Sequence, residues 1–388
     1  MNRREFLKLS ALAITITQGM PQFLAKAAAL ADDDKTLVVL QLSGGNDGLN
    51  TLVPFTNGAY YAARPNIAIA KKDLIPVSAD LGMHPSLVKF AKFFDDGQLA
   101  WMENVGYPNP NRSHFASMAI WNTADASGMG RDGWISKISE EIGDPFCATQ
   151  LGGSPVLAIK NSNGSLPAIR SLEGFKLQIS AGLEPAFNNI LALSRTGEAD
   201  FIKKSNMQMI ENTKRLSQQV AGYSPAVKYP KSKIATRLQE SASLIATGDN
   251  QRVIYLTQGG FDTHADQRKN QDRLLLEVAE ALAAFQEDLR LQGLDDKVMV
   301  LAFSEFGRRV AENASGGTDH GQGSVMFALG KNVKGGIYGD SPDLENLSQG
   351  DIKYKQDFRG VYASALDNWL KISSSEVLGQ NFTGPNYV

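Results

Sequence analysis

Three of the four histidines lie in short polar segments, which also contain most of the potential metal ligands. His114, His264 and His320 follow predicted strands or open a predicted helix, whereas His84 stands before a helix start, where a local structural role is favoured. Surface histidines scattered by chance would not be placed so consistently. Because the chain has one cysteine, Cys147, it can form neither an internal disulfide nor a thiolate zinc site. Any metal ion must therefore be held by histidine, carboxylate and hydroxyl groups.

The segment Asp262-Thr-His264 follows a predicted strand and two glycines. An aspartate and a neutral imidazole two residues apart can bind one metal ion if the loop turns. His320 lies in a loop rich in glycine, serine and asparagine, where a histidine is seldom a core residue. We predict Asp262, His264 and His320 as metal ligands, with a purely structural role as the alternative.

Two further carboxylates follow predicted strands, at the edge where parallel sheets bind ligands. Asp47 lies in Gly-Gly-Asn-Asp-Gly, which can present a carboxylate ligand but is also the composition of a tight turn. Glu305 follows another strand, with Arg308 close behind it. We predict Asp47 and Glu305 as metal ligands. Arg308 and its neighbour Arg309 could clamp an anion with two hydrogen bonds, unless they are solvated or paired with Glu312. Arg308 is the candidate catalytic residue.

Ser113 precedes a helical pattern that runs to Trp121. Ser113 or Asn111 is a good N-cap, and capping alone can explain the serine. A serine at a helix N-terminus also lies in a positive field with free backbone N–H groups, which suits a phosphate or sulfate ester. A nearby metal ion could activate its hydroxyl group. Ser113 is therefore a candidate catalytic nucleophile, with the N-cap as the alternative.

Continuous apolar runs predict the strands that must position these residues. The runs at 36–42, 252–258 and 297–303 are typical of strands buried on both faces of a parallel sheet. Shorter candidates lie at 99–105 and 324–329.

A helix is predicted from about 266 to 292, because apolar residues recur there at steps of three and four. Placed between two strands, it forms a right-handed crossover unit of a parallel sheet. The stretch 183–248 has helical patterns without a convincing strand. We predict it to be a helical insertion in a single α/β domain that spans 32–388.

The segment 1–31 predicts an export signal. Arg3 and Arg4 are followed by Phe-Leu-Lys, a short apolar stretch and two Ala-x-Ala cleavage sites ending at Ala27 and Ala31. This order matches a twin-arginine signal peptide, with a chance arginine pair on an ordinary signal peptide as the alternative. The apolar run is shorter than the roughly 18–20 residues that a membrane span needs. We expect a periplasmic or secreted protein, exported by the twin-arginine machinery and without stable membrane insertion after cleavage.

Composition limits the class of protein. The chain has 388 residues, 43% of them hydrophobic, and its 39 basic and 41 acidic residues nearly balance. These values exclude collagen, coiled coils and intrinsic disorder. They give no electrostatic case for nucleic-acid binding.

Taken in chain order, these segments resemble the alkaline phosphatase and sulfatase superfamily. The resemblance implies a three-layer α/β/α fold with a mostly parallel sheet and with metal ligands on loops at its C-terminal edge. It assigns superfamily roles to the residues already singled out: Asp47 as the first metal ligand, Ser113 as the nucleophile, Asp262 with His264 as the downstream pair, Glu305 as the carboxylate of the Ser-Asp-His-Gly loop, and His320 as the last histidine.

More narrowly, the chain is similar to a family of twin-arginine-exported bacterial proteins of unknown function within that superfamily. The similarity spans nearly the whole mature chain and rests on Gly-Gly-Asn-Asp-Gly-Leu-Asn, Asn-Arg-Ser-His-Phe, Gly-Gly-Phe-Asp-Thr-His, Phe-Ser-Glu-Phe-Gly-Arg and Gly-Thr-Asp-His-Gly. The chain departs from the superfamily in two places. Only Thr263 separates the aspartate from the histidine, and the segment 304–307 lacks the histidine of the superfamily loop.

The resemblance implies an exported metal-dependent hydrolase of small anionic phosphate or sulfate esters, with one or two divalent ions. Oxygen ligands from Asp47 and Glu305 favour magnesium, manganese or calcium. A site with Asp262, His264 and His320 suits zinc or manganese. The missing histidine supports an alternative of another class, a non-catalytic periplasmic binding or assembly protein whose metal site is degenerate or structural.

Overall fold

The structure, a computed structural model, describes residues 34–162, 164–172, 220, 222–248 and 250–388. The predicted signal peptide and the stretch 183–219 of the predicted helical insertion lie outside the described residues. The described end of that insertion contains α10 (Lys233–Ala246), where the sequence also predicts a helix.

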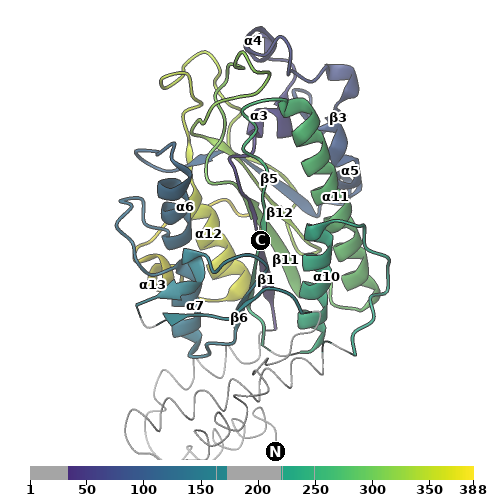
Figure 1. Cartoon of the computed structure of the whole chain (residues 1–388), viewed down its shortest axis with the longest axis vertical. Helices are drawn as coiled ribbons and strands as arrows, with labels where there is room; N and C mark the ends of the chain where they lie inside the picture. The colour runs from purple at the N-terminus through teal and green to yellow at the C-terminus, as the bar shows by residue number, and fades with distance from the viewer. Residues whose placement is uncertain (1–33, 163, 173–219, 221, 249) are drawn as a thin grey trace, which may run out of the picture.

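A mixed, mostly parallel sheet forms the centre of the described chain (Figure 1). Its nine strands run in the order β13-β5-β12-β11-β1-β10-β6-β9, with β14 paired to β5. Their bounds are β1 (Thr36–Leu42), β5 (Leu99–Gly106), β6 (Ala148–Leu151), β9 (Ala168–Ile169), β10 (Val253–Gln258), β11 (Val298–Phe303), β12 (Ser324–Leu329), β13 (Gly336–Tyr338) and β14 (Gln356–Asp357). β12 pairs antiparallel with β5 and β11, and the other pairs are parallel.

Helices cover both faces of the sheet, which makes three layers (Figure 1). α5 (Val88–Asp95), α10 and α11 (Gln267–Leu291) pack on one face, and α6 (His114–Thr123), α7 (Trp134–Ile142), α12 (Phe358–Ser364) and α13 (Ser374–Leu378) pack on the other. In β1, Val38, Leu40 and Leu42 belong to one core cluster, and Leu37 and Val39 to the other. Because successive side chains of a strand point to opposite faces, a strand that is apolar throughout requires helices on both sides. The predicted three-layer α/β/α class is confirmed.

Shorter elements lie in the connections. They are α3 (Gly48–Thr51), β2 (Leu52–Pro54), α4 (Gly58–Ala63), η1 (Lys71–Asp73), β3 (Ile75–Pro76), β4 (Leu81–Met83), η2 (Pro85–Leu87), η3 (Leu157–Ile159), β7 (Lys160–Asn161), β8 (Gly164–Ser165) and η4 (Ala365–Leu370). None of the helices in the described ranges combines the length and the apolar character needed to cross a membrane.

The strands that bear the candidate residues are those predicted from the sequence. β1 and β12 have the predicted bounds, and β5, β10 and β11 differ from them by one residue at one end. β10 and β11 flank β1 and run parallel to it. Because parallel strands end at the same edge of a sheet, the loops that follow β1, β10 and β11 meet there.

Glu103 is a buried carboxylate on β5 that makes stability depend on pH. Burial, together with the nearby Asp80, raises its pKa from about 4.5 to about 7. The folded state therefore binds this proton more tightly than the unfolded state, and stability is lost as the pH rises from about 4.5 to 7. We expect Glu103→Gln to raise the free energy of unfolding by about 2–3 kcal/mol at pH 8 and to change it little at pH 4. Urea unfolding at both pH values measures this, and an equal effect at both would contradict it.

Candidate metal centre

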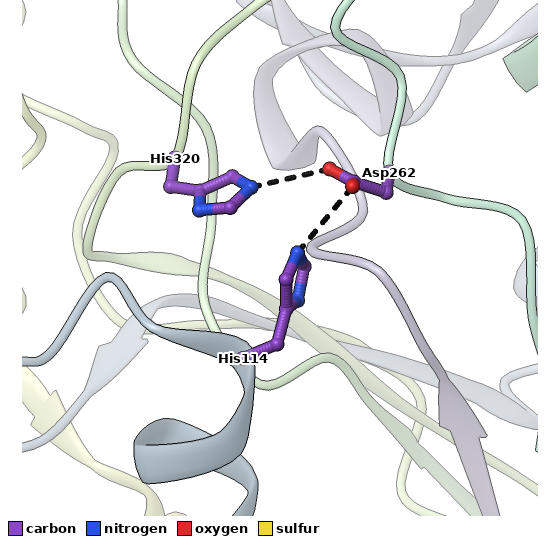
Figure 2. A group of neighbouring side chains, drawn as sticks. All are labelled: His114, Asp262 and His320. Carbon is purple, nitrogen blue, oxygen red and sulfur yellow. Dashed lines mark hydrogen bonds and ion pairs between the residues drawn. The ribbon is translucent and has the colours of Figure 1, made fainter.

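Three histidines and one aspartate converge at this edge of the sheet. His114 is the first residue of α6, Asp262 and His264 follow β10, and His320 lies between β11 and β12. Figure 2 shows His114 and His320 pointing to the carboxylate of Asp262 from different segments. The ligand atoms of these three residues all lie within 4.8 Å of one another.

Asp262 is spaced from Nε2 of each histidine as one ligand of an ion is from another. Asp262 Oδ1 lies 3.1 Å from Nε2 of both His264 and His320, and Asp262 Oδ2 lies 3.5 Å from Nε2 of His114. The Nε2 atoms of His264 and His320 are 2.9 Å apart. In a tetrahedral zinc site with bonds of roughly 2.0–2.1 Å, neighbouring ligand atoms lie about 3.3 Å apart.

The other ring nitrogen of each histidine is held by a hydrogen-bond acceptor. Nδ1 of His114 lies 2.9 Å from Glu305 Oε1, Nδ1 of His264 lies 3.1 Å from Asp319 Oδ1, and Nδ1 of His320 lies 2.7 Å from the carbonyl oxygen of Arg112. Each of these oxygens can accept a hydrogen bond from Nδ1, an arrangement that leaves Nε2 of the ring on the side of the aspartate, where it can bind a metal ion. Metal-binding histidines are oriented in this way.

Two features of the cluster call for a cation. Nε2 of His114 is buried and has no hydrogen-bond partner among the described residues. The Nε2 atoms of His264 and His320 face each other at 2.9 Å, a contact that requires a proton or a cation between the two nitrogens. Three imidazole nitrogens and a carboxylate oxygen form a ligand set that suits zinc. The residues therefore fit a divalent metal ion.

The charges of the cluster suit a metal ion as well. Partial burial alone would raise the pKa of Asp262, but hydrogen bonds from Arg308 and His320 lower it to about 2. Burial lowers the pKa of His320, which favours the neutral form that a metal ion binds. The hydrogen bond to Glu305 raises the pKa of His114, so a metal ion competes with a proton there.

Arg308 is fully buried and contacts the carboxylate of Asp262. Nη2 donates to Asp262 Oδ1 at 2.8 Å. Its three nitrogens also donate to backbone carbonyl groups, those of Gly44, Gly45, Phe261 and Thr318. These contacts engage every nitrogen of the guanidinium, so Arg308 is not placed to clamp an anion as the sequence predicts. It holds Asp262 and the surrounding loops in position.

Glu305 lies behind His114 rather than among the ligand atoms. Its buried Oε1 accepts a hydrogen bond from the N–H of Gly44 at 2.8 Å and contacts Nδ1 of His114. Gly44 has a φ of +122°, and a Cβ atom there would lie 2.3 Å from the nitrogen of Asp262. Only a glycine lets the chain after β1 come so close to the loop after β10. The contacts of Glu305 are those of a residue that orients a ligand.

Asp47 lies in a separate buried ion pair, and the structure does not bring it to the ligand atoms. Its carboxylate contacts the guanidinium of Arg64 at 2.6 and 3.1 Å and accepts a further hydrogen bond from Gln267. It also caps α3 by accepting from the N–H of Leu49. These contacts favour the structural alternative, a turn and cap, over metal binding.

Ser113 occupies the N-cap position of α6, one residue before His114. Its side chain is exposed and makes no capping hydrogen bond. The capping alternative therefore does not account for its hydroxyl group, which is open to solvent beside the cluster.

One protein family matches residues 34–359 of the chain, a range that contains the whole cluster. The chain belongs to this family, described as a protein of unknown function, DUF1501. A comparison with curated proteins finds no match.

Solved structures similar to this DUF1501 member include a protein in the alkaline phosphatase superfamily from Vibrio parahaemolyticus, at 9% identity and a TM-score of 0.42, covering 99% of this chain and 79% of that chain. The sulfatase PsFucS1 from Pseudoalteromonas sp. matches at 11% identity and a TM-score of 0.39, covering 95% and 75%. The C-terminal periplasmic domain of EcEptC from Escherichia coli, in complex with Zn, matches at 11% identity and a TM-score of 0.35, covering 77% and 73%.

Two residues of the centre in this DUF1501 member are absent from the sequence predictions, His114 within the cluster and Asp319 beside it. The segment Asn-Arg-Ser-His-Phe was assigned to the serine without His114, and Asp319, which holds His264, was passed over. The shared placement of three histidines in polar segments was the available signal for His114. No signal in the sequence pairs Asp319 with His264.

Glu305→Gln is expected to weaken zinc binding about tenfold to a hundredfold, because a neutral amide is a poorer acceptor for Nδ1 of His114. Competition with a chromogenic zinc chelator measures the affinity. Asp319→Asn is the matched comparison, and we expect a smaller loss because His264 is more exposed than His114. Wild-type zinc affinity in Glu305→Gln would contradict the orienting role.

Proposed function

We propose that the chain is an exported hydrolase of phosphate or sulfate esters that uses a divalent metal ion, most simply zinc, held by His114, Asp262 and His320, with His264 beside them. One observation carries the proposal: three imidazole Nε2 atoms converge on one carboxylate, and Nε2 of His114 is buried without a hydrogen-bond partner.

Exposure of the cluster supports a catalytic rather than a structural centre. The side chains of Asp262 and His264 are 47% and 45% exposed. Structural zinc sites are closed by four protein ligands, whereas catalytic sites have three and keep the fourth position for water or substrate, as the group His114, Asp262 and His320 would. A metal ion bound here would supply Lewis-acid polarisation of an ester oxygen.

The chain itself supplies a nucleophile and a positive field. The Ser113 hydroxyl, adjacent to His114 and open to solvent, would attack the phosphorus or sulfur atom of the ester and lose its proton to solvent, while the bond to the alcohol breaks and the alcohol leaves with a proton from solvent. Water would then hydrolyse the serine ester, which releases phosphate or sulfate and restores the hydroxyl group. The free N–H groups of the first turn of α6 would hold the negative charge that develops on the ester oxygens. Arg308 keeps Asp262 ionised and in place during the reaction.

The test is a metal analysis and an ester screen on the mature chain, purified without chelator. We expect about one equivalent of metal and hydrolysis of p-nitrophenyl phosphate or p-nitrophenyl sulfate. Ser113→Ala should lower kcat roughly a thousandfold or more without loss of metal. Retained metal without turnover of either ester would favour a non-catalytic periplasmic binding or assembly protein. Unchanged activity in Ser113→Ala would remove the nucleophile from the proposal.

Export by the twin-arginine machinery is also part of the proposal, and it rests on Arg3 and Arg4. Replacing both by lysine is expected to leave the uncleaved chain in the cytoplasm. Cell fractionation with an antibody against the mature chain measures this, and undiminished periplasmic protein would contradict it.

A further inference from the structure

Next to the metal centre, two arginines share one buried carboxylate. Arg112 donates from Nε, at 2.9 Å, and from Nη2 to Oδ2 of Asp351. Nε of Arg309 lies 3.8 Å from Oδ1 of the same carboxylate. Asp351 is fully buried, whereas the side chains of Arg112 and Arg309 are 32% and 40% exposed. Two positive charges thus share one buried negative charge, while the pKa of the more exposed Asp319 is lowered by its hydrogen bond with His264 and also by the charge of Arg309.

The shared carboxylate does not satisfy the two guanidinium groups. Oδ1 of Asp351 is buried without a hydrogen-bond partner, so its contact with Arg309 is an ion pair and not a hydrogen bond. Among the described residues, the guanidinium of Arg309 makes no hydrogen bond, and Arg112 uses two of its three nitrogens. Each guanidinium has five N–H donors in a planar fork that matches phosphate and sulfate groups. Several donors of the pair therefore face solvent.

Main-chain contacts attach both arginines to the metal centre but keep them away from its ligand atoms. The carbonyl oxygen of Arg112 contacts Nδ1 of His320, on the opposite edge of the ring from Nε2, which faces Asp262. The N–H of Arg309 donates at 3.0 Å to the carbonyl oxygen of Asp319, the neighbour of His320. The backbones of both arginines therefore contact His320 or its neighbour, and not the ligand atoms themselves.

We infer that Arg112 and Arg309 bind a second anionic group of the substrate, distinct from the ester group at the metal centre. The inference rests on the proposed function and narrows its substrate class to esters with at least two anionic groups, such as doubly phosphorylated or doubly sulfated sugars. Arg308 cannot take this role, because its nitrogens are already engaged and its side chain is buried. The exposed N–H donors of Arg112 and Arg309 are available to bind the second anionic group.

The competing explanation is that the two arginines only fix the loop around Asp351. The two explanations differ for Arg309, whose contact with Asp351 is long. A fixing role predicts that Arg309→Ala lowers stability without an effect on anion binding. An anion site predicts that Arg309→Ala weakens anion binding without lowering stability.

The first experiment measures anion binding without hydrolysis. Inorganic phosphate is titrated calorimetrically into the full mature chain after treatment with chelator. Arg309→Ala should weaken phosphate binding about tenfold to a hundredfold. Arg290→Ala, which removes an exposed arginine of α11 that pairs with Glu287, is the control and should bind phosphate like wild type. Phosphate binding that is the same in Arg309→Ala and wild type overturns the inference.

The second experiment compares kcat/KM of the metal-loaded protein for glucose 1,6-bisphosphate and glucose 1-phosphate, or for the doubly and singly sulfated sugars if the screen finds a sulfatase. Wild type should prefer the doubly charged ester, and Arg309→Ala should lose about tenfold or more of that preference while keeping its rate on the singly charged one. Equal losses on both esters would place Arg309 at the reacting group and overturn the inference. If phosphate binding depends on Arg309 but no ester is hydrolysed, the anion site stands and the proposed hydrolase fails.

Discussion

Asp262→Asn is expected to lose the metal ion, and with it any hydrolase activity. Asp262 contributes the carboxylate of the cluster, and both of its oxygens face histidine Nε2 atoms. Structural zinc sites bind with about 10–16 kcal/mol, so one of four ligands contributes roughly 3–4 kcal/mol, or a hundred- to a thousandfold in affinity. We expect a loss of that size in zinc affinity, measured by competition with a chromogenic chelator.

The matched control for this prediction is Asp272→Asn. Asp272 also contacts a histidine, His84, but this pair lies outside the cluster. We expect wild-type zinc affinity in the control. Retention of zinc by Asp262→Asn, or equal losses in the two variants, would show that the cluster is not the metal centre.

Asp47→Asn is expected to destabilise the fold by about 3–5 kcal/mol and to leave metal binding unchanged. Arg64 and Asp47 are 0% and 1% exposed, so removing the carboxylate charge leaves a guanidinium buried without its counter-ion. The side chain of asparagine keeps the shape and can still cap α3. Urea unfolding gives the change in the free energy of unfolding, and elemental analysis gives the metal content.

The control for the ion pair is Glu287→Gln, which breaks the exposed pair with Arg290 on α11. Exposed pairs contribute about 0–1 kcal/mol, so this variant should unfold almost like wild type. Loss of metal from Asp47→Asn at unchanged stability would restore Asp47 as a ligand. Loss of stability with metal retained would establish it as part of the framework.

The sequence determined the elements of this protein because their signals are local. Strands buried on both faces appear as continuous apolar runs, as in 36–42, and the amphipathic pattern near 266–292 repeats within a few residues. The short segment Asp262-Thr-His264 was found for the same reason, since two of its side chains converge within one loop. A parallel sheet in an α/β domain follows from these runs and their order, and the resemblance to the superfamily implied the three layers.

Tertiary structure alone decided what each charged side chain does. Arg64 captures Asp47 from 17 residues away, whereas Glu305 and Arg308 meet their partners at His114 and Gly44 across 191 and 264 residues. A carboxylate or guanidinium takes its role from the nearest group of opposite charge or matching hydrogen-bonding capacity in a buried setting. The order of the strands in the sheet decides which group is the partner, and the partner cannot be predicted from the spacing of residues along the chain. For this reason the sequence located the edge of the sheet where the centre lies, and the packing of three loops selected which of its residues could face a metal ion.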